Sequence, residues 1–145
     1  SESRDIRARE PKDREVNWDM VKVKITEYSA SNGKEFFIQA TDKENDILVG
    51  FCRLRFPFEF LRGEITVDSA LIRELHVYGT ATSLGKDGKV QHKGWGQKLM
   101  KVAEKIAVEQ GKKKMVVISG VGVREYFRCK LGYKKEGPYM VKVLI

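Results

Sequence analysis

A pair of glycines at the start of an amphipathic segment is the feature that most limits how this chain can fold. From Trp95 onward, apolar residues recur with the i, i+3, i+4 spacing of a helix packed on a core, at Leu99, Val102, Ala103, Ile106 and Ala107. Gly111 suits the left-handed end of that helix. Gly94 and Gly96 stand at its beginning, where free N–H groups and the helix dipole attract an anion and glycine lets it approach. The sequence Gln91-His92-Lys93-Gly94-Trp95-Gly96 therefore predicts a pyrophosphate-binding turn.

Two other phosphate-binding motifs fit this segment less well. Gly79 and Gly85 enclose five residues where a P-loop has four, and Asp87 follows Lys86 where a P-loop has Ser or Thr. The Gly94–Gly96 pair has no third glycine three residues later, so it is also a poor dinucleotide-binding fingerprint. A glycine-rich helix start without a ligand stays open as the alternative.

The size and composition are those of one globular domain. A chain of 145 residues is long enough to bury its own core, and no apolar run approaches the ~20 residues of a membrane span. Residues 1–14 lack the apolar stretch of a secretory signal, which favours a cytoplasmic protein with no membrane partner. The net charge of +8 suits an anionic partner such as nucleic acid or a phosphorylated cofactor, but from charge alone ordinary solubilising lysines are the favoured explanation.

Cysteine and histidine are too few and too scattered for a metal site. Cys52 and Cys129 belong to no Cys-x-x-Cys pair and are expected to be buried, reduced thiols. His76 and His92 cannot complete a metal shell by themselves. The sequence therefore predicts that this chain holds no metal.

The hydrophobic pattern predicts an α+β fold. Residues 1–18 are highly charged and are expected to be an arm or a join to another domain, with the folded domain at 19–145. Within it, Leu71, Leu75 and Val77 are expected on one face of a strand, and alternation places Glu74, His76 and Tyr78 together on one face. Strands are expected at 21–28, 36–40, 47–56, 69–78, 115–119 and 139–145, with a loop at 79–90 and a second helix at 124–131. This order predicts a mixed, mainly antiparallel sheet flanked by helices.

Four sequence blocks together resemble a known family. Gln91, Gly94 and Gly96 fit the pattern Gln/Arg-x-x-Gly-x-Gly/Ala with which GNAT acetyltransferases bind the coenzyme A pyrophosphate, and Leu-Gly-Tyr at 131–133 resembles the segment that closes those domains. The blocks are Arg73-Glu74-Leu75-His76-Val77-Tyr78-Gly79, Gln91-His92-Lys93-Gly94-Trp95-Gly96, Ile118-Ser119-Gly120-Val121-Gly122-Val123-Arg124 and Gly137-Pro138-Tyr139-Met140. Over residues 46–145 they resemble the catalytic subunit of Elongator, in the tRNA carboxymethyluridine synthase family.

That resemblance implies a GNAT fold and an acyltransferase that uses acetyl-CoA as co-substrate. The family joins a radical S-adenosylmethionine domain to a C-terminal acetyltransferase domain and modifies the wobble uridine, U34, of tRNA, with acetyl-CoA hydrolysis triggered by bound tRNA. Residues 4–10 resemble the join to the radical domain. Two cysteines cannot hold an iron–sulfur cluster, so the cluster and S-adenosylmethionine are expected only in a radical domain outside this chain. The expected protein partners are that radical domain or other Elongator-type subunits. Candidate tRNA phosphate contacts are Arg4, Arg7, Arg9, Lys112, Lys113 and Lys114.

The same resemblance assigns the acetyl-CoA site. The strand residues Glu74, Leu75, His76 and Val77 would border the pantetheine, and their backbone would bond its amides. The pyrophosphate would lie on Trp95, Gly96 and Gln97 beside Gln91 and Gly94, with His92 and Lys93 adding positive charge. Tyr126 and Phe127 complete the set, and the Tyr126 hydroxyl would protonate the departing thiolate. Glu74 beside His76 suits acid–base chemistry, although His76 is equally well explained as a structural histidine.

Two departures from the family pattern keep other functions open. The usual paired tyrosines read Tyr126-Phe127 here, and one extra residue precedes Gly132, so the helix register at these residues is uncertain. One alternative is a protein lysine N-acetyltransferase, which would share the cofactor site. The other is a non-catalytic tRNA-binding or assembly module with a decayed pocket.

Overall fold

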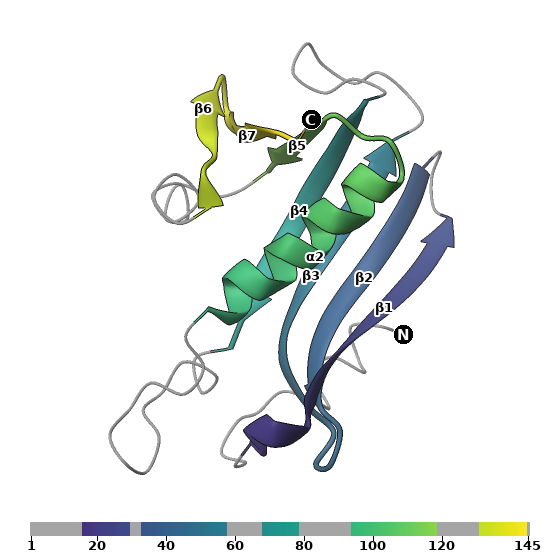
Figure 1. Cartoon of the computed structure of the whole chain (residues 1–145), viewed down its shortest axis with the longest axis vertical. Helices are drawn as coiled ribbons and strands as arrows, with labels where there is room; N and C mark the ends of the chain where they lie inside the picture. The colour runs from purple at the N-terminus through teal and green to yellow at the C-terminus, as the bar shows by residue number, and fades with distance from the viewer. Residues whose placement is uncertain (1–15, 30–32, 58–67, 79–93, 119–130, 145) are drawn as a thin grey trace.

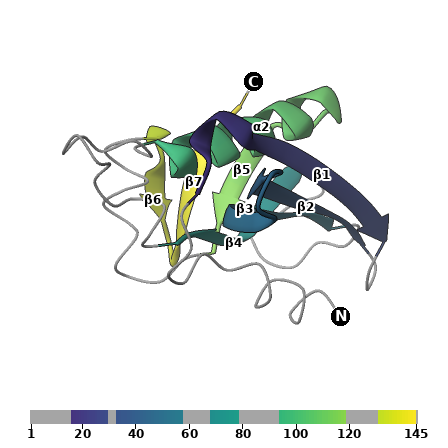
Figure 2. The same ribbon diagram turned by 90° about the horizontal axis from the view of Figure 1, so that it is seen from below.

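In the part of the chain that the structure describes, a seven-stranded sheet has one long helix across a face (Figures 1 and 2). The computed structural model describes residues 16–29, 33–57, 68–78, 94–118 and 131–144. The elements are η1 (Trp18–Met20), β1 (Val21–Ser29), β2 (Gly33–Asp42), β3 (Ile47–Pro57), β4 (Ser69–Val77), α2 (Trp95–Glu109), β5 (Lys114–Val117), β6 (Lys134–Glu136) and β7 (Tyr139–Val143). The strand order is β1-β2-β3-β4-β5-β7-β6. The expected α+β plan with a mixed, mainly antiparallel sheet is confirmed.

The first four strands form an antiparallel meander, as strand segments separated by short turn sequences predict. The β1–β2 hairpin pairs Val21 with Asp42 at one end and Ser29 with Lys34 at the other. The strand β3 ends at Pro57, which lacks an N–H to donate to a further pair. These strands put one apolar face toward α2, so the meander supplies most of the core.

The second half of the sheet is joined to the first by a short parallel ladder. Only Ser69–Ile72 of β4 pair with Lys114–Val117 of β5, and β7 then pairs antiparallel with β5. The strand β6 was not predicted from the sequence; it pairs with β7 through a turn at Gly137 with φ of 59°. Its Lys-Lys-Glu sequence is exposed and has low strand propensity, so pairing with β7 decides its structure.

The helix α2 packs on the sheet with the face that its apolar spacing predicts. Leu99, Met100, Ala103 and Ala107 are buried against β2, β3 and β4. Gly111 follows with φ of 81°, the left-handed conformation expected at the helix end. Of the expected second helix, the described residues include only Leu131, which is helical, and Gly132 follows it with φ of 78°.

A β-bulge in β4 corrects one expectation about its faces. Arg53 pairs with Glu74 but its neighbour Leu54 pairs with Ile72, so Arg73 is an extra residue in β4. Leu75 and Val77 pack toward α2, whereas Leu71 joins a separate cluster with Val116, Tyr139 and Val141. The prediction that Leu71 shares a face with Leu75 and Val77 is therefore wrong, because the extra residue shifts the alternation by one.

The segment just before β1 packs against the core. Val16 is buried and Trp18 is partly buried on the same cluster as α2, although both fall in the stretch that the charge pattern predicted to be an arm. The Asn17 side chain accepts from the Asp19 backbone N–H and so caps η1. No helix in the described ranges is long and apolar enough to cross a membrane.

A buried polar cluster ties α2 to the second half of the sheet. The Tyr133 hydroxyl donates to Glu104 Oε2 at 2.7 Å, and Lys142 Nζ on β7 lies 3.1 Å from Glu104 Oε1. Burial and the Glu104 charge raise the pKa of Tyr133, so its hydroxyl stays protonated and donates. One carboxylate on α2 therefore anchors groups from two later segments.

Replacing this carboxylate should weaken the fold measurably. We expect Glu104→Leu to lower the free energy of unfolding by about 2 kcal/mol, because the Tyr133 and Lys142 donors lose a common acceptor. Urea denaturation of the variant checks this value. Glu109→Leu, at the exposed end of the same helix, is the matched control and should change stability by less than about 0.5 kcal/mol. Equal losses in the two variants would contradict this role of Glu104.

Candidate functional site

The N-terminus of α2 has the geometry of an anion site. Gly94 precedes the helix with φ of 97°, and within the described residues no side chain caps this end. Lys98 N–H donates to Gly94 O at 2.9 Å, so the N–H groups of Trp95, Gly96 and Gln97 precede the first intrahelical bond. The first turn has no acidic residue, and a Cβ built on Gly94 would have nothing within 4 Å. The space, the open N–H groups and the dipole together fit a phosphate.

The last residues of β4 present an open backbone edge. Pairing with β5 stops at Ile72 and Val117, and in the described ranges no strand continues that side of β4. Tyr78 N–H donates to Val49 O on β3 at 3.1 Å. Alternation therefore turns the backbone N–H and C=O groups of Leu75 and Val77 away from β3, toward the open side. Of Glu74, Leu75, His76 and Val77, which were expected to border a pantetheine, only Leu75 and Val77 therefore direct their backbone N–H and C=O groups to the open side of β4.

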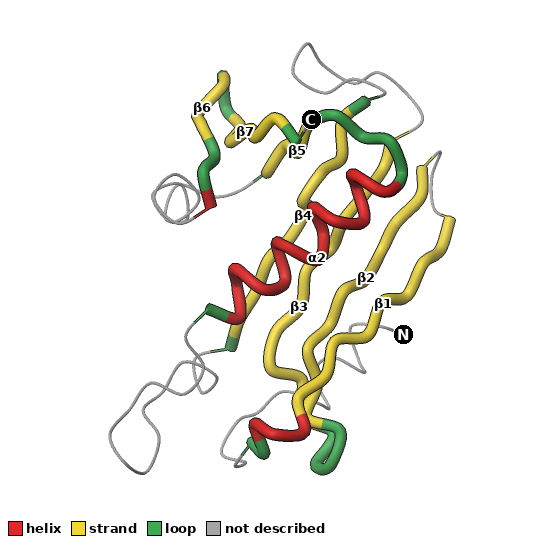
Figure 3. The backbone as a smooth tube through the Cα atoms, viewed as in Figure 1, coloured by secondary structure: helices red, strands yellow, loops and turns green. Residues whose placement is uncertain are grey.

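The open edge of β4 and the first turns of α2 lie at the same end of the molecule (Figure 3). Gly50 on β3 brings them together. A Cβ on Gly50 would lie 2.9 Å from His76 O, 3.3 Å from Val77 Cα and 3.4 Å from Leu99 Cδ1. A residue without a side chain thus lets the strand end and the helix pack on β3 at one point.

The side chains of Glu74 and His76 lie on the sheet face opposite α2, together with Tyr78 as alternation predicts. The His76 ring centroid is 4.4 Å from that of Tyr78 and 5.9 Å from that of Phe51. Glu74 Oε1 lies 3.2 Å from Arg53 Nε, so its carboxylate is paired with an arginine of β3. The expected acid–base pair of Glu74 and His76 is therefore divided between an ion pair and an aromatic cluster.

Several expected site residues lie outside the described residues. These are Gln91, His92 and Lys93 before the helix, and Tyr126 and Phe127 in the expected second helix. Among the described residues, no group of three or more His, Cys, Asp or Glu side chains could hold a metal ion. Cys52 is a buried free thiol as expected, and burial raises its pKa to about 12, so it is a poor nucleophile at neutral pH.

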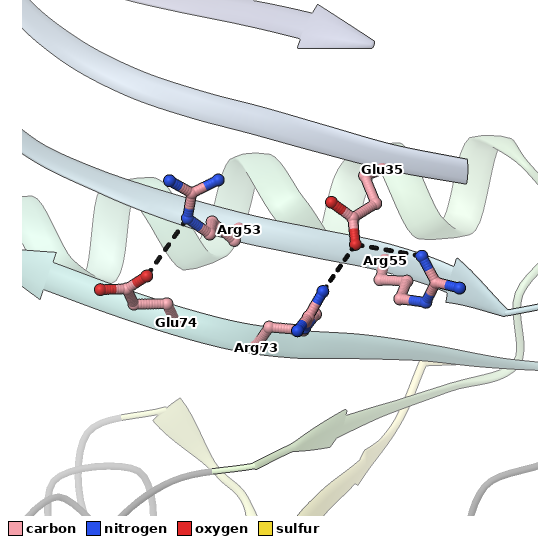
Figure 4. Close-up of polar contacts among 5 residues, drawn as sticks. All are labelled: Glu35, Arg53, Arg55, Arg73 and Glu74. Atoms are coloured by element: carbon pink, nitrogen blue, oxygen red, sulfur yellow. Dashed lines mark hydrogen bonds and ion pairs between the residues drawn. The ribbon is translucent and has the colours of Figure 1, made fainter. Parts of the chain in front are cut away.

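A charged cluster next to the site was not predicted from the sequence. It consists of Glu35, Arg53, Arg55, Arg73 and Glu74, all on the face opposite α2 (Figure 4). Glu35 lies two strands away from Arg73, so only knowledge of the sheet register brings them together. The alternation of β2 and β3 was the available signal, because it puts charged residues on a face that also contains Phe37 and Phe51.

A helix start that no described side chain caps, next to parallel strands whose pairing stops at Ile72 and Val117, is the arrangement of an acyl-coenzyme A-binding fold. The chain belongs to the acetyltransferase (GNAT) family, whose model matches residues 3–133. The PaiA N-acetyltransferase from Thermoplasma acidophilum, solved with coenzyme A, is 22% identical, superposes with a TM-score of 0.53 over 75% of this chain and 60% of its own, and supports the fold alone.

More specific relatives confirm the resemblance to Elongator's catalytic subunit. The chain is 51% identical to tRNA uridine(34) acetyltransferase of Methanocaldococcus jannaschii over 86% of this chain and 24% of the relative. It is 42% identical to human Elongator complex protein 3 over 97% of this chain and 27% of the relative. The solved Elp3 of Methanocaldococcus infernus superposes with a TM-score of 0.77 at 45% identity, covering 88% of this chain and 31% of that one. The chain thus spans about a quarter of the length of these curated relatives.

Proposed function

We propose that this chain is the acetyl-CoA-binding acetyltransferase domain of an Elongator-type enzyme that modifies U34 of tRNA. The observation that carries the cofactor assignment is the N-terminus of α2, which no described side chain caps, beside the open edge of β4. The coenzyme A pyrophosphate would bind the N–H groups of Trp95, Gly96 and Gln97. The pantetheine amides would bond the backbone of Leu75 and Val77, which directs the thioester along β4.

The tRNA part of the proposal is supported by the names of the relatives and by the charge of the chain. One relative is named for acetyl transfer to tRNA uridine 34, and the chain has a net charge of +8. In this proposal, bound tRNA stimulates acetyl-CoA hydrolysis, and a radical S-adenosylmethionine domain or partner outside the chain completes the uridine modification. Lys112, Lys113 and Lys114 follow α2 and are the described candidates for phosphate contacts.

Roles for individual side chains follow from their chemistry. The Tyr126 hydroxyl would protonate the coenzyme A thiolate as it leaves, with Phe127 beside it. Glu74 is ion-paired with Arg53, so we assign it an electrostatic role beside the site. His76 packs against Phe51 and Tyr78, so we assign it to shaping the wall of the site.

Blocking the helix start is the direct test of the cofactor site. Gly96→Trp should weaken acetyl-CoA binding at least tenfold, about 1.4 kcal/mol, because the indole would fill the space that the pyrophosphate needs. Calorimetric titration of the 145-residue chain measures the Kd. Lys101→Trp, on the exposed face of the same helix, is the matched control and should leave the Kd unchanged. Unchanged binding in the Gly96 variant would refute the pyrophosphate assignment.

The acceptor is tested by acetyl-CoA turnover under three conditions. Turnover is measured with tRNA, with a lysine-containing peptide and with neither. Stimulation by tRNA alone supports the U34 reading, whereas stimulation by the peptide alone would identify a lysine acetyltransferase. Failure to bind acetyl-CoA at all would indicate a non-catalytic module.

A further inference from the structure

One carboxylate connects four neighbouring strands beside the candidate site. Glu35 Oε1 on β2 accepts from Arg55 Nη1 on β3 at 3.0 Å and from Arg73 Nη1 on β4 at 2.8 Å (Figure 4). Tyr28 on β1 also hydrogen-bonds Glu35. Charge-assisted bonds of this length are among the stronger ones in proteins. The side chain of Glu35 therefore fixes groups from β1, β3 and β4 relative to one another.

The carboxylate of Glu35 is largely buried, so losing its hydrogen bonds would be costly. The Glu35 side chain is 10% exposed and that of Arg55 is 14% exposed, whereas Arg73 reaches the surface at 54%. Burial pushes the pKa of Glu35 up, but the hydrogen bonds from Arg73, Tyr28 and Arg55 outweigh it and hold the pKa below its usual range. Glu35 is thus charged at neutral pH, and a buried charge without its partners is costly.

The group that Glu35 holds on β4 is the extra residue of the bulge. Arg73 has no partner opposite it in the β3–β4 register, in which Arg53 pairs with Glu74 and Leu54 with Ile72. Its side chain is bonded to β2 instead, and the next residue, Glu74, is bonded to Arg53 of β3. Both residues of the bulge are therefore held from the same face of the sheet.

The bulge lies immediately before the backbone that the proposed cofactor would contact. Bulges bend a strand and re-aim the residues that follow, and the residues that follow here are Leu75 to Val77, where the edge of β4 is open. We propose that Glu35 is a positioning residue that fixes the bulge through Arg73 and so sets the direction of the β4 edge for the pantetheine of acetyl-CoA. This inference rests on the proposed function for its ligand, but the effect on β4 is independent of it.

Binding of two ligands to the 145-residue chain separates this role from a general loss of stability. Acetyl-CoA uses both the helix start and β4, whereas 3′-phosphoadenosine 5′-diphosphate carries only the pyrophosphate half. Glu35→Gln should weaken acetyl-CoA binding five- to tenfold and leave the fragment within twofold of the unchanged chain. Equal weakening of both ligands, or of neither, would overturn the proposal.

Nuclear magnetic resonance of the ligand-free chain tests the effect of Glu35 on β4 without any cofactor. The amide signals of Leu75 and Val77 should shift in Glu35→Gln, while those of Gly96 and Gln97 in α2 should not. If the signals of Leu75 and Val77 do not move, the role of Glu35 is overturned, whether or not acetyl-CoA binds. If acetyl-CoA does not bind, only the proposed function is contradicted.

Matched variants complete the experiment. Glu27→Gln removes a carboxylate that pairs with Lys34 at 3.5 Å on the hairpin away from β4, and it should leave both ligands and the β4 signals unchanged. Arg73→Met, at a more exposed position, should reproduce the selective loss even if Glu35→Gln fails to fold. Adding Glu35→Gln to Arg73→Met should then weaken acetyl-CoA binding little further, because both changes break the same contact between Glu35 and Arg73. Fully additive losses would contradict a route through Arg73.

Discussion

Replacing Asp42 with alanine is expected to lower the free energy of unfolding by about 3 kcal/mol, because several N–H groups lose one buried acceptor. Its carboxylate is fully buried and accepts from Asn17 N at 2.7 Å, Glu44 N at 2.9 Å, Asn45 N at 3.2 Å and Asn45 Nδ2 at 2.9 Å. It joins the segment before β1 to the β2–β3 turn. Urea denaturation measures the loss, and Asp19→Ala, at an exposed position of η1, should change stability by less than about 0.5 kcal/mol.

The same carboxylate gives the stability a defined pH dependence. Burial pushes the pKa of Asp42 up, but the bonds from Asn17, Asn45 and Glu44 outweigh it and hold the pKa below its usual range. A carboxyl group with a lowered pKa in the folded state contributes stability above its unfolded pKa, near ~3.9, and loses it as pH falls through the folded value. The unchanged chain and Asp42→Asn should therefore differ most at neutral pH and converge in acid. A constant difference from pH 7 to pH 3 would contradict this linkage.

Replacing Gly50 with valine is expected to cost about 3 kcal/mol of stability, at the upper end of overpacking effects. The new Cβ would lie 2.9 Å from His76 O, a backbone atom that cannot move without shifting β4. The bulk would also push on Leu99 of α2, so acetyl-CoA binding should weaken with stability. Thermal and urea denaturation, followed by calorimetry below the melting temperature, measure both effects.

Gly33→Val is the comparison for this substitution. A Cβ on Gly33 would lie 2.6 Å from Arg55 Cζ, and the Arg55 side chain can shift at the cost of straining its bond to Glu35, whereas the neighbour of Gly50 is a backbone atom. We therefore expect Gly33→Val to cost clearly less than Gly50→Val. A larger loss at Gly33 would show that side-chain contacts, and not the close backbone approach of β3 to β4, limit this part of the sheet.

The parts of the fold that depend on local pattern were predictable from the sequence. The spacing of Leu99, Ala103 and Ala107 and the glycine at 111 locate α2 and its end, because helix period and left-handed glycine are local signals. The start of the candidate site at Gly94 and Gly96 was predictable for the same reason. The hairpin of β1 and β2 follows from the alternation of the first strand, the turn residues Ser31-Asn32-Gly33 and the strand formers at 36–40.

Features that depend on pairing between distant residues were not predictable. The bulge at Arg73 exists only relative to β3, so uninterrupted alternation misplaced Leu71. The strand β6 forms only because it pairs with β7. The contact of Glu35 with Arg73 joins residues 38 positions apart in sequence, and that of Asp42 with Asn17 joins residues 25 positions apart. Tyr126 and the other expected site residues outside the described ranges stay predictions.

The bulge in β4 also limits how this segment can change over evolution. Because Arg73 is the extra residue opposite Arg53, deleting it would restore an unbroken β3–β4 register with Leu75 still opposite Cys52, and it would remove the bend that the bulge introduces before the open edge of β4. A substitution here changes one side chain, whereas this deletion would change the direction of every later residue of the strand at once. We therefore expect functional homologues to vary in the residue types of this stretch and to keep its length.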